Sequence, residues 1–195
     1  MLFSHHPYYD MPSPSPLDRF PRRSLVFRHR LVIRITETTK DNLMVSVSSP
    51  QTGLADVCAP ILRALPEWFG REEANQHYIA FIEDNPTLLA TVDSHPAGFL
   101  TLAQHYPESA EIYVMGVLPD QHRSGIGRAL VAAAEAYLKA KGTRFLQVKT
   151  LGAAHPDAGY QRTRLFYLGV GFTPLEEFED LWGDIPALQL IKYLG

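Results

Sequence analysis

The sequence predicts an α/β (α+β) protein built on one mixed sheet, mostly antiparallel with parallel central strands, and flanked by about four helices. Three observations lead to this prediction. Short apolar runs of strand length lie next to one another towards both ends of the chain, which favours antiparallel pairing. In the middle, strands alternate with helical patterns, which favours a parallel crossover. With 195 residues, 46% of them hydrophobic and 20% charged, the chain has the composition of one globular domain.

Residues 1–43 differ in composition from the rest of the chain. The first 24 residues are rich in Pro, Ser, His and Arg, which cannot build a core. Residues 25–36 alternate apolar and basic side chains, as an amphipathic strand would. We predict a poorly ordered Pro/Arg-rich extension, residues 1–43, and one folded domain, residues 44–195. Two interpretations of the extension stay open: a basic arm that contacts a partner or nucleic acid, or a stretch preceding a true translation start at Met44.

Two helices are predicted after the first strand, which begins near Met44. From Gln51 the apolar residues recur at helical spacing, with Thr52 as the N-cap and Pro60 as a kink. The apolar face consists of Leu54, Val57, Cys58, Ile61, Leu62 and Leu65. The second helix covers residues 71–83. Cys58 is interpreted as a core residue, and because it is the only cysteine it excludes an internal disulfide and fits a reducing compartment.

The remaining elements follow from the same periodicities. Three strands, residues 87–92, 97–103 and 110–118, form a meander whose first turn is Asp93–Pro96. A helix runs from Ile126 to Lys141 and is closed by Gly142. The last elements are a strand at 144–150, a short helix at 160–168, and strands at 172–178 and 187–194.

A glycine loop joins the third meander strand to the following helix. Gly125 and Gly127 let the backbone turn tightly and come close to a ligand. The first amides of the helix have no intrahelical partner and carry the positive end of its dipole, so the loop predicts a phosphate site. The loop is not a P-loop, because Gly-Lys-Ser/Thr is missing. It is not a good dinucleotide fingerprint either, because Leu130 stands at the third glycine position.

Two motifs resemble those of the GCN5-related N-acetyltransferase (GNAT) superfamily. His122-Arg-Ser-Gly-Ile-Gly127 resembles the family's acetyl-CoA loop, Arg/Gln-x-x-Gly-x-Gly/Ala, which opens a helix after a bulged strand. Residues 165–172, Leu-Phe-Tyr-Leu-Gly-Val-Gly-Phe, resemble the Phe-Tyr-x-x-x-Gly-Phe element. The motifs have the family's order and separation, and the resemblance covers residues 44 to the C-terminus. Histidine at 122 and Tyr160, where many relatives have asparagine, depart from the pattern.

The resemblance implies a GNAT-like fold and transfer of an acetyl group from acetyl-CoA directly to a primary amine. No metal and no covalent enzyme intermediate are required. The backbone of one short stretch would pair with the pantetheine arm, namely Met115, Gly116 and Val117. The glycine loop would hold the pyrophosphate, namely Arg123, Ser124, Gly125, Ile126, Gly127 and Arg128.

Two residues are implied as catalytic. Tyr167 would protonate the leaving thiolate, since a phenol is protonated at neutral pH; the alternative is a buried tyrosine with a satisfied hydroxyl. Glu111 would accept the proton of the amine, directly or through water, with its pKa raised by desolvation; the alternative is an exposed strand-end charge. His122 and His155 are weaker candidates for the base.

Charge and composition limit the partners. The net charge is −3, but residues 1–40 hold seven basic and three acidic residues, so the remainder carries eleven basic against eighteen acidic residues. An acidic body suits a small cationic amine, with Trp68, Phe69 and Tyr78 as candidates for the pocket lining. The alternatives are a protein N-terminal or lysine acetyltransferase and a non-catalytic acyl-CoA-binding module. No apolar run approaches the roughly 20 residues of a membrane-spanning helix, and no signal peptide is evident. We therefore expect a cytoplasmic protein that binds neither membrane nor, from its net charge, nucleic acid; a homodimer stays open.

Overall fold

The computed structural model describes residues 44–155, 157–183 and 185–195. The extension, residues 1–43, lies outside the described residues. The strands are β1 (Val45–Val47), β2 (Thr87–Val92), β3 (His95–Tyr106), β4 (Ser109–Val117), β5 (Phe145–Leu151), β6 (Thr173–Phe178) and β7 (Ala187–Tyr193). The helices are α1 (Ala55–Arg63), α2 (Glu72–Asp84), α3 (Ile126–Ala140) and α4 (Ala158–Gly169), with a short 3₁₀ helix η1 (Pro119–Gln121).

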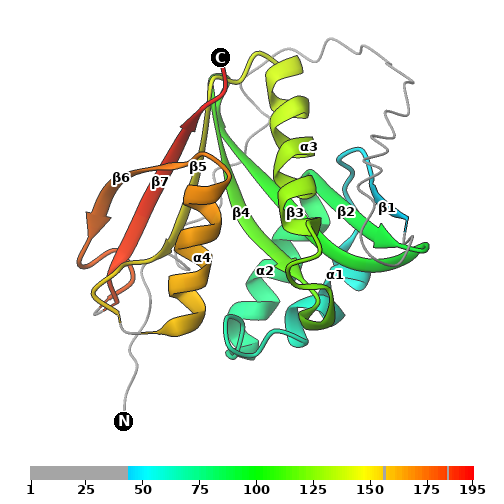
Figure 1. Ribbon diagram of the computed structural model, residues 1–195, viewed down its shortest axis with the longest axis horizontal. Coiled ribbons are helices and arrows are strands. Elements are labelled where there is room, and N and C mark those ends of the chain that lie inside the picture. The colour runs from blue at the N-terminus through cyan, green and yellow to red at the C-terminus, as the bar shows by residue number, and fades with distance from the viewer. Residues whose placement is uncertain (1–43, 156, 184) are drawn as a thin grey trace.

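The strands form one seven-stranded sheet in the order β1-β2-β3-β4-β5-β7-β6 (Figure 1). The β4–β5 pair is parallel, and the other five pairs are antiparallel. The parallel pair needs a crossover connection, which α3 supplies. The predicted mixed sheet with about four helices is therefore confirmed.

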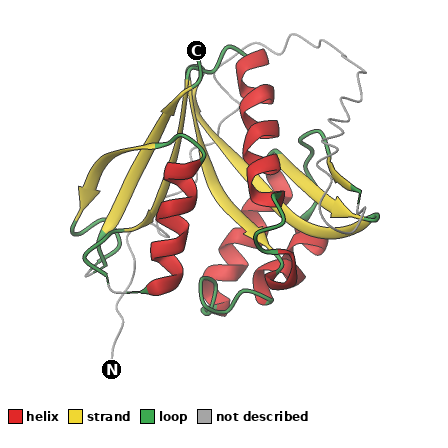
Figure 2. Ribbon diagram, viewed as in Figure 1, coloured by secondary structure: helices red, strands yellow, loops and turns green. Residues whose placement is uncertain are grey.

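The helices divide between the two faces of the sheet. Figure 2 shows α3 and α4 in front of it and α1 and α2 behind it. Each face has its own core. The larger core lies under α3 and includes Leu100, Ile112, Leu130 and Leu146. The smaller core joins α1 and α2 to the other face and includes Cys58, Leu62, Phe99 and Val114.

The feature that makes room for a site is the divergence of β4 and β5. The two strands pair only where Ser109–Ile112 meets Phe145–Val148. Beyond this point β4 continues along β3 and β5 continues along β7. At the same place Tyr113 is an extra residue in β4, because Thr101 pairs with Val114 and Leu102 with Ile112. Such a bulge bends and twists a strand.

Two local predictions need correction. The first helix begins at Ala55 with Leu54 in the N-cap position and no side-chain cap, so Thr52 is not its cap. The first hairpin turn is shorter than Asp93–Pro96, because β3 already begins at His95. Asp93 and Ser94 both have positive φ, 46° and 69°, as a two-residue hairpin turn of the type that matches strand twist requires.

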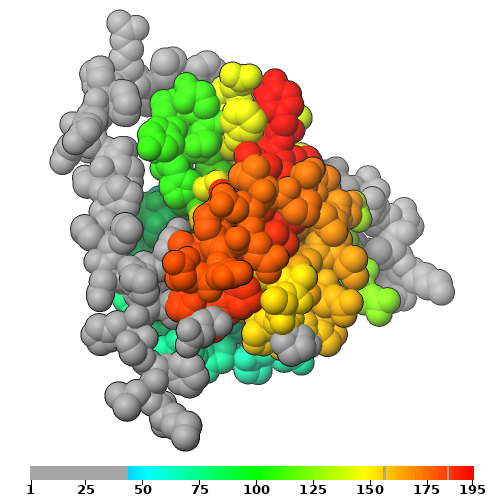
Figure 3. Space-filling view, turned by 90° about the vertical axis from the view of Figure 1, so that its left-hand side faces the viewer, coloured from blue at the N-terminus to red at the C-terminus, as the bar shows by residue number. Residues whose placement is uncertain are grey.

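The β6 edge of the sheet is largely exposed. Figure 3 shows β6, in orange, on the surface of the molecule. Residues 173–177 are all exposed, and Phe178 is half-buried. Among the described residues, β6 pairs only with β7. Within the same ranges, no helix has the length and apolar character needed to cross a membrane.

Candidate active site

A cavity of about 980 Å³ lies where β4 and β5 diverge. At one end it is lined by the loop before α3, and at the other by Glu111 and Lys149. Glu111 lies between Ala110 and Ile112, which both pack in the core under α3. Because side chains alternate along a strand, Glu111 points to the opposite face, the face of α1 and α2. The cavity therefore passes through the sheet from one face to the other.

The loop before α3 presents backbone amides at the first end of the cavity. Arg123 and Gly125 both have left-handed φ angles, 65° and 89°, and Gly125 is the N-cap residue of α3. The first backbone hydrogen bond of the helix runs from the amide of Ala129 to the carbonyl of Gly125. The amides of residues 126–128 therefore have no intrahelical acceptor, and the helix dipole adds positive potential there. This is the geometry of an anion site.

Side chains of the loop fix its shape. His122 donates from Nε2 to the carbonyl of Val117, 2.8 Å away, so the histidine at the first motif position ties the loop to the end of β4. The hydroxyl of Ser124 donates to the carbonyl of Gln121. Arg128 donates to the carbonyl of Gly169 at the end of α4, which holds α3 and α4 together beside the cavity.

Tyr167 lies on α4 and is 5% exposed. It lines the cavity and its ring contacts those of Phe166 and Phe172 edge-on. Its hydroxyl makes no hydrogen bond within the described part of the chain. Burial raises the pKa of the Tyr167 phenol above its ordinary value, so the hydroxyl keeps its proton at neutral pH. Tyr167 can therefore act as a proton donor but not as a base.

Glu111 is buried, 5% exposed, and carries an ion pair. Its Oε2 atom accepts hydrogen bonds from His105 Nε2 at 2.7 Å, Lys149 Nζ at 2.8 Å and Gln147 Nε2 at 3.2 Å. Burial alone would raise the pKa of Glu111, but the hydrogen bond from His105 and the charge of Lys149 outweigh it and hold the pKa below its ordinary value. The expectation of a raised pKa is therefore wrong, and so is the alternative of an exposed strand-end charge.

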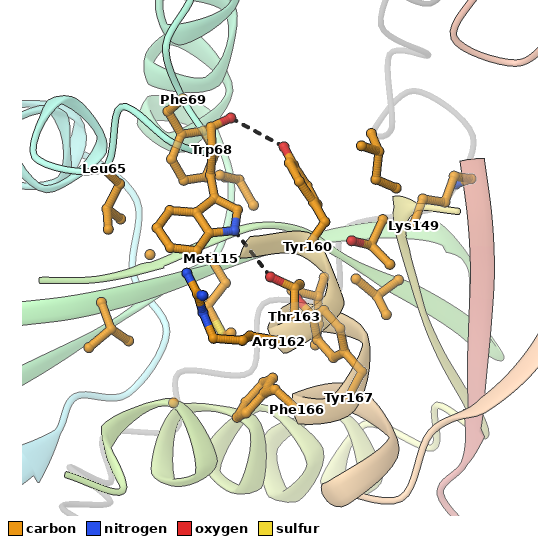
Figure 4. Close-up of a pocket in the computed structure, with 18 of the residues that line it drawn as sticks. Leu65, Trp68, Phe69, Met115, Lys149, Tyr160, Arg162, Thr163, Phe166 and Tyr167 are labelled. Atoms are coloured by element: carbon orange, nitrogen blue, oxygen red, sulfur yellow. Dashed lines mark hydrogen bonds between the residues drawn. The ribbon is translucent and has the colours of Figure 1, made fainter. Parts of the chain in front are cut away.

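A bridge between the α1–α2 connection and α4 crosses the cavity (Figure 4). Trp68 donates from Nε1 to the hydroxyl of Thr163, 3.1 Å away. The hydroxyl of Tyr160 donates to the carbonyl of Trp68 at 3.4 Å. We call Trp68, Tyr160 and Thr163 the Trp68 bridge. Tyr160 stands where many relatives have a cofactor-binding asparagine, and here it holds the bridge.

The charges around the cavity are mostly positive. Among the described lining residues, Glu111 is the one acidic side chain. The basic lining residues are Arg71, Arg123, Arg128, Lys149 and Arg162. Arg162 and Arg71 form ion pairs with Glu67 and Glu73 at the surface. Within the described ranges, no group of three or more His, Cys, Asp or Glu side chains is placed to hold a metal ion.

The structure brings nearly all the predicted site residues to one cavity. Those that line it are Glu111, Met115, Gly116, Val117, Arg123, Gly125, Ile126, Gly127, Arg128 and Tyr167. Ser124 does not line it, because its hydroxyl is used inside the loop. His155 does not line it either, whereas the proposed aromatic lining residues Trp68, Phe69 and Tyr78 do.

Sequence reasoning missed His105, Lys149 and the bridging role of Tyr160. His105 and Lys149 are one polar and one charged residue on β3 and β5, outside any motif. Their significance comes from the sheet, which places both next to Glu111 on β4. One signal was available: Lys149 is a charged residue inside an apolar strand pattern, and such a residue needs a partner when it is buried.

Comparisons with known proteins agree with this geometry. A sequence model of the Acetyltransferase (GNAT) family matches residues 56–168. A mycothiol acetyltransferase of Saccharopolyspora erythraea is 41% identical over 61 residues, which cover 30% of this chain and 20% of that protein. The chain thus spans about a fifth of the length of that relative.

Two solved structures show the same fold. The ribosomal-protein-S18-alanine N-acetyltransferase from Escherichia coli has a TM-score of 0.63 at 18% identity, over 78% of this chain and 95% of that one. An aminoglycoside 6'-N-acetyltransferase complexed with coenzyme A has a TM-score of 0.61 at 16% identity, over 76% and 97%. The family match covers more than half of the chain, and so the chain belongs to the acetyltransferase (GNAT) family.

Proposed function

We propose that the protein is an acetyl-CoA-dependent N-acetyltransferase that acts on a small amine with an apolar or aromatic body. The observation that carries this proposal is the cavity through the sheet, which has an anion site at one end, a buried Glu111 at the other, and Tyr167 along its wall. A phosphate-bearing cofactor and an amine can enter such a cavity from opposite faces. The resemblance in the glycine loop makes acetyl-CoA the cofactor expected there.

The reaction needs no covalent enzyme intermediate. The ammonium form of the amine first gives a proton to solvent water, directly or through Glu111, and the neutral nitrogen then attacks the thioester carbonyl carbon. When the tetrahedral intermediate collapses, the carbon–sulfur bond breaks. The sulfur leaves as a thiolate and takes a proton from the Tyr167 hydroxyl. The second nitrogen proton passes to solvent, from which Tyr167 is reprotonated. A backbone amide of the β4 stretch near Met115 would polarise the carbonyl. Removing one such preorganised donor typically costs about 10²–10³ in rate.

The lining supports a monoamine rather than a polycation. The described lining offers one acidic side chain, Glu111, and one of its two oxygens is already occupied, so it can pair with one ammonium group but not with the several of a polyamine or aminoglycoside. The described lining is instead rich in aromatic residues, among them Trp68, Phe69, Tyr78, Tyr113 and Trp182. Aromatic rings bury apolar groups and also attract a single ammonium group. The proposed acceptor is therefore a small amine that carries one positive charge on an apolar or aromatic body.

The Trp68 bridge weighs against an extended peptide as the acceptor. A long peptide requires an open groove, whereas the hydrogen bonds from Trp68 and Tyr160 cross this cavity between α4 and the α1–α2 connection. A protein N-terminal or lysine acetyltransferase is thus the second candidate. A non-catalytic acyl-CoA-binding module is the third, and it gives no reason for the proton donor Tyr167 to line the cavity.

One experiment separates these candidates. Release of free coenzyme A is measured with acetyl-CoA and three panels: aromatic monoamines, polyamines with aminoglycosides, and short peptides with free N-termini. We expect turnover in the first panel and a higher kcat/KM there than in the others. A preference for polycations or peptides would overturn the acceptor, and acetyl-CoA binding without turnover in any panel would indicate a binding module. Failure to bind acetyl-CoA by calorimetry would overturn the function itself.

A further inference from the structure

Three hydrogen-bond donors converge on one oxygen of the Glu111 carboxylate. His105 on β3 and Lys149 and Gln147 on β5 all donate to Oε2. None of the hydrogen bonds between described residues reaches Oε1. A carboxylate has about four lone-pair sites on its two oxygens, so Glu111 is filled on one side and open on the other. Glu111 lines the cavity, and its open oxygen keeps the capacity to accept a hydrogen bond from a ligand there.

We propose that His105 and Lys149 are positioning residues for the acceptor amine: they occupy Oε2 of Glu111 and leave Oε1 as the atom that accepts a hydrogen bond from the amine. This inference rests on the proposed function. In this role Glu111 orients the amine and offers it a negative charge, so Glu111 acts in its ionised form.

The second part of the argument concerns charge. The Lys149 side chain is 12% exposed and that of Glu111 is 6% exposed, so neither charge is well hydrated. A buried carboxylate without a counter-ion tends to take up a proton. Lys149 and His105 are the titratable groups that the described strands place against it, from β5 and β3. They keep the carboxylate ionised, in agreement with the lowered pKa of Glu111.

A third observation fixes the geometry of the network. Gln147 donates to Oε2 of Glu111 and accepts a hydrogen bond from Gln189 of β7 on its own Oε1 atom. The network thus runs across β3, β4, β5 and β7, at the level where β4 and β5 still pair. Because the network lies beside the last paired residues of β4 and β5, Glu111 stands where the two strands begin to diverge and the cavity opens.

The test uses the full chain and four variants: Glu111→Gln, Lys149→Met, Lys149→Arg and Gln147→Met. The amine is the aromatic monoamine with the highest kcat/KM for the wild type. Glu111→Gln should raise the KM for the amine about 10- to 100-fold, as for loss of a hydrogen bond to a charged group. Lys149→Met should raise KM and move the acid limb of the kcat/KM profile up by about 1–3 pH units, since an opposite charge at this range lowers a carboxyl pKa by that amount. Lys149→Arg should restore most of both.

The direction of the pH shift follows from the loss of the positive charge of Lys149, which raises the pKa of Glu111. Activity is lost as pH falls through the pKa of Glu111, so a raised pKa moves this loss to higher pH. Gln147→Met removes a donor but no charge, and it should move the acid limb much less than Lys149→Met. Affinity for acetyl-CoA, measured by calorimetry, should stay unchanged in all four variants.

A second measurement needs no turnover. The side-chain carboxyl carbon of Glu111 is followed by NMR against pH in the coenzyme A complex of the wild type and of Lys149→Met, or of Lys149→Gln if Lys149→Met does not fold. An equal titration midpoint, or an unchanged KM for the amine in Lys149→Met, would overturn the positioning role. A wild type that binds acetyl-CoA yet acetylates no amine would overturn the proposed function instead.

Discussion

The two ends of the cavity are built in different ways. The cofactor end is a run of backbone amides from residues that are neighbours in the sequence, ordered by the left-handed turns at Arg123 and Gly125. The acceptor end is made of side chains from β3, β4 and β5 and from the Trp68 bridge, which lie far apart in the sequence. A backbone site depends on which residues can adopt the turn. A side-chain site depends on the whole sheet and can vary while the cofactor end stays constant.

The largest effect is expected at the cofactor end, from Gly125→Asp. The substitution adds a carboxylate next to the free amides of α3, where the proposed pyrophosphate would sit, and it strains a position with φ of 89°. We expect acetyl-CoA binding to become undetectable by calorimetry. Gly125→Asn is the matched control, because it is nearly isosteric, uncharged and more tolerant of left-handed backbone.

Gly125→Asn should retain measurable affinity if the charge is decisive. Gly127→Asp should behave like Gly125→Asp, with an added packing cost because a Cβ there would lie 3.2 Å from the ring of Phe166. Unchanged affinity for acetyl-CoA in either folded aspartate variant would show that the backbone amides of this loop do not bind the cofactor.

The next effect concerns Tyr167, which lies between the two ends. Tyr167→Phe keeps the ring packing against Phe166 and Phe172 and removes only the proton donor. We expect the single-turnover rate to fall by about 10²–10⁴, the usual contribution of general acid catalysis, with little change in acetyl-CoA affinity. A rate within twofold of wild type would make Tyr167 a packing residue.

The pH dependence sharpens this prediction. Because burial raises the Tyr167 pKa, the proton donor is present across the neutral and mildly alkaline range and is lost only above the ordinary tyrosine pKa of about 10. The single-turnover rate of the wild type should therefore not decline between pH 7 and about 9 on account of this residue. A basic limb in this range that disappears in Tyr167→Phe would contradict the raised pKa of Tyr167, while it would still identify Tyr167 as the proton donor.

A smaller effect is expected from the Trp68 bridge. Trp68→Phe keeps an aromatic ring but removes the hydrogen bond from Nε1 to Thr163. A neutral hydrogen bond contributes about 0.5–1.5 kcal/mol, so the KM for the amine should rise roughly 2- to 12-fold while the affinity for acetyl-CoA stays within error. Thr163→Val removes the same bond from the other side. The two variants should have similar effects, and the double variant should add little.

The smallest effect is expected from removal of residues 1–43. The described sheet begins at Val45, and every residue that we assign to the cavity lies after it. A chain that starts at Met44 should therefore fold and bind acetyl-CoA with the affinity of the full chain. If it fails to fold or to bind acetyl-CoA, the prediction is wrong and the extension is an integral part of the domain. If only the KM for the amine changes, the extension contributes to the acceptor end.

The two ends also differ in what the sequence reveals. The glycine loop could be predicted because its function follows from local backbone chemistry: a left-handed Gly125, a helix start and free amides lie within a few residues. Most of the fold could be predicted for the same reason, since the helical periodicity of Leu54 to Leu65 is itself a local pattern. Parallel strands in the centre of the sheet were also expected, because a helix separates β4 from β5.

The acceptor end could not be predicted in the same way. Glu111 was identified by resemblance, but the direction of its pKa shift depends on His105 and Lys149, and both reach it only through strand register. Burial does raise the pKa of Glu111, as expected, but His105 and Lys149 on the neighbouring strands outweigh it. Likewise, Tyr160 departs from the family pattern, and nothing in the sequence indicates that its hydroxyl meets a carbonyl 92 positions away.

The divergence of β4 and β5 has a consequence for the energetics of the empty protein. Past Ile112, no described strand pairs with β4 on the β5 side. The Val117 carbonyl is bonded to His122, and the other peptide groups of this edge are left to solvent until a ligand completes the ladder. On the proposed function, the pantetheine arm acts as this missing strand, and binding stabilises the fold by mass action, about 2.7 kcal/mol at a ligand concentration of 100 Kd. Hydrogen exchange of the β4 amides between Tyr113 and Val117 should therefore slow when acetyl-CoA is added, while the amides of β1 and β2 keep their rates relative to global unfolding.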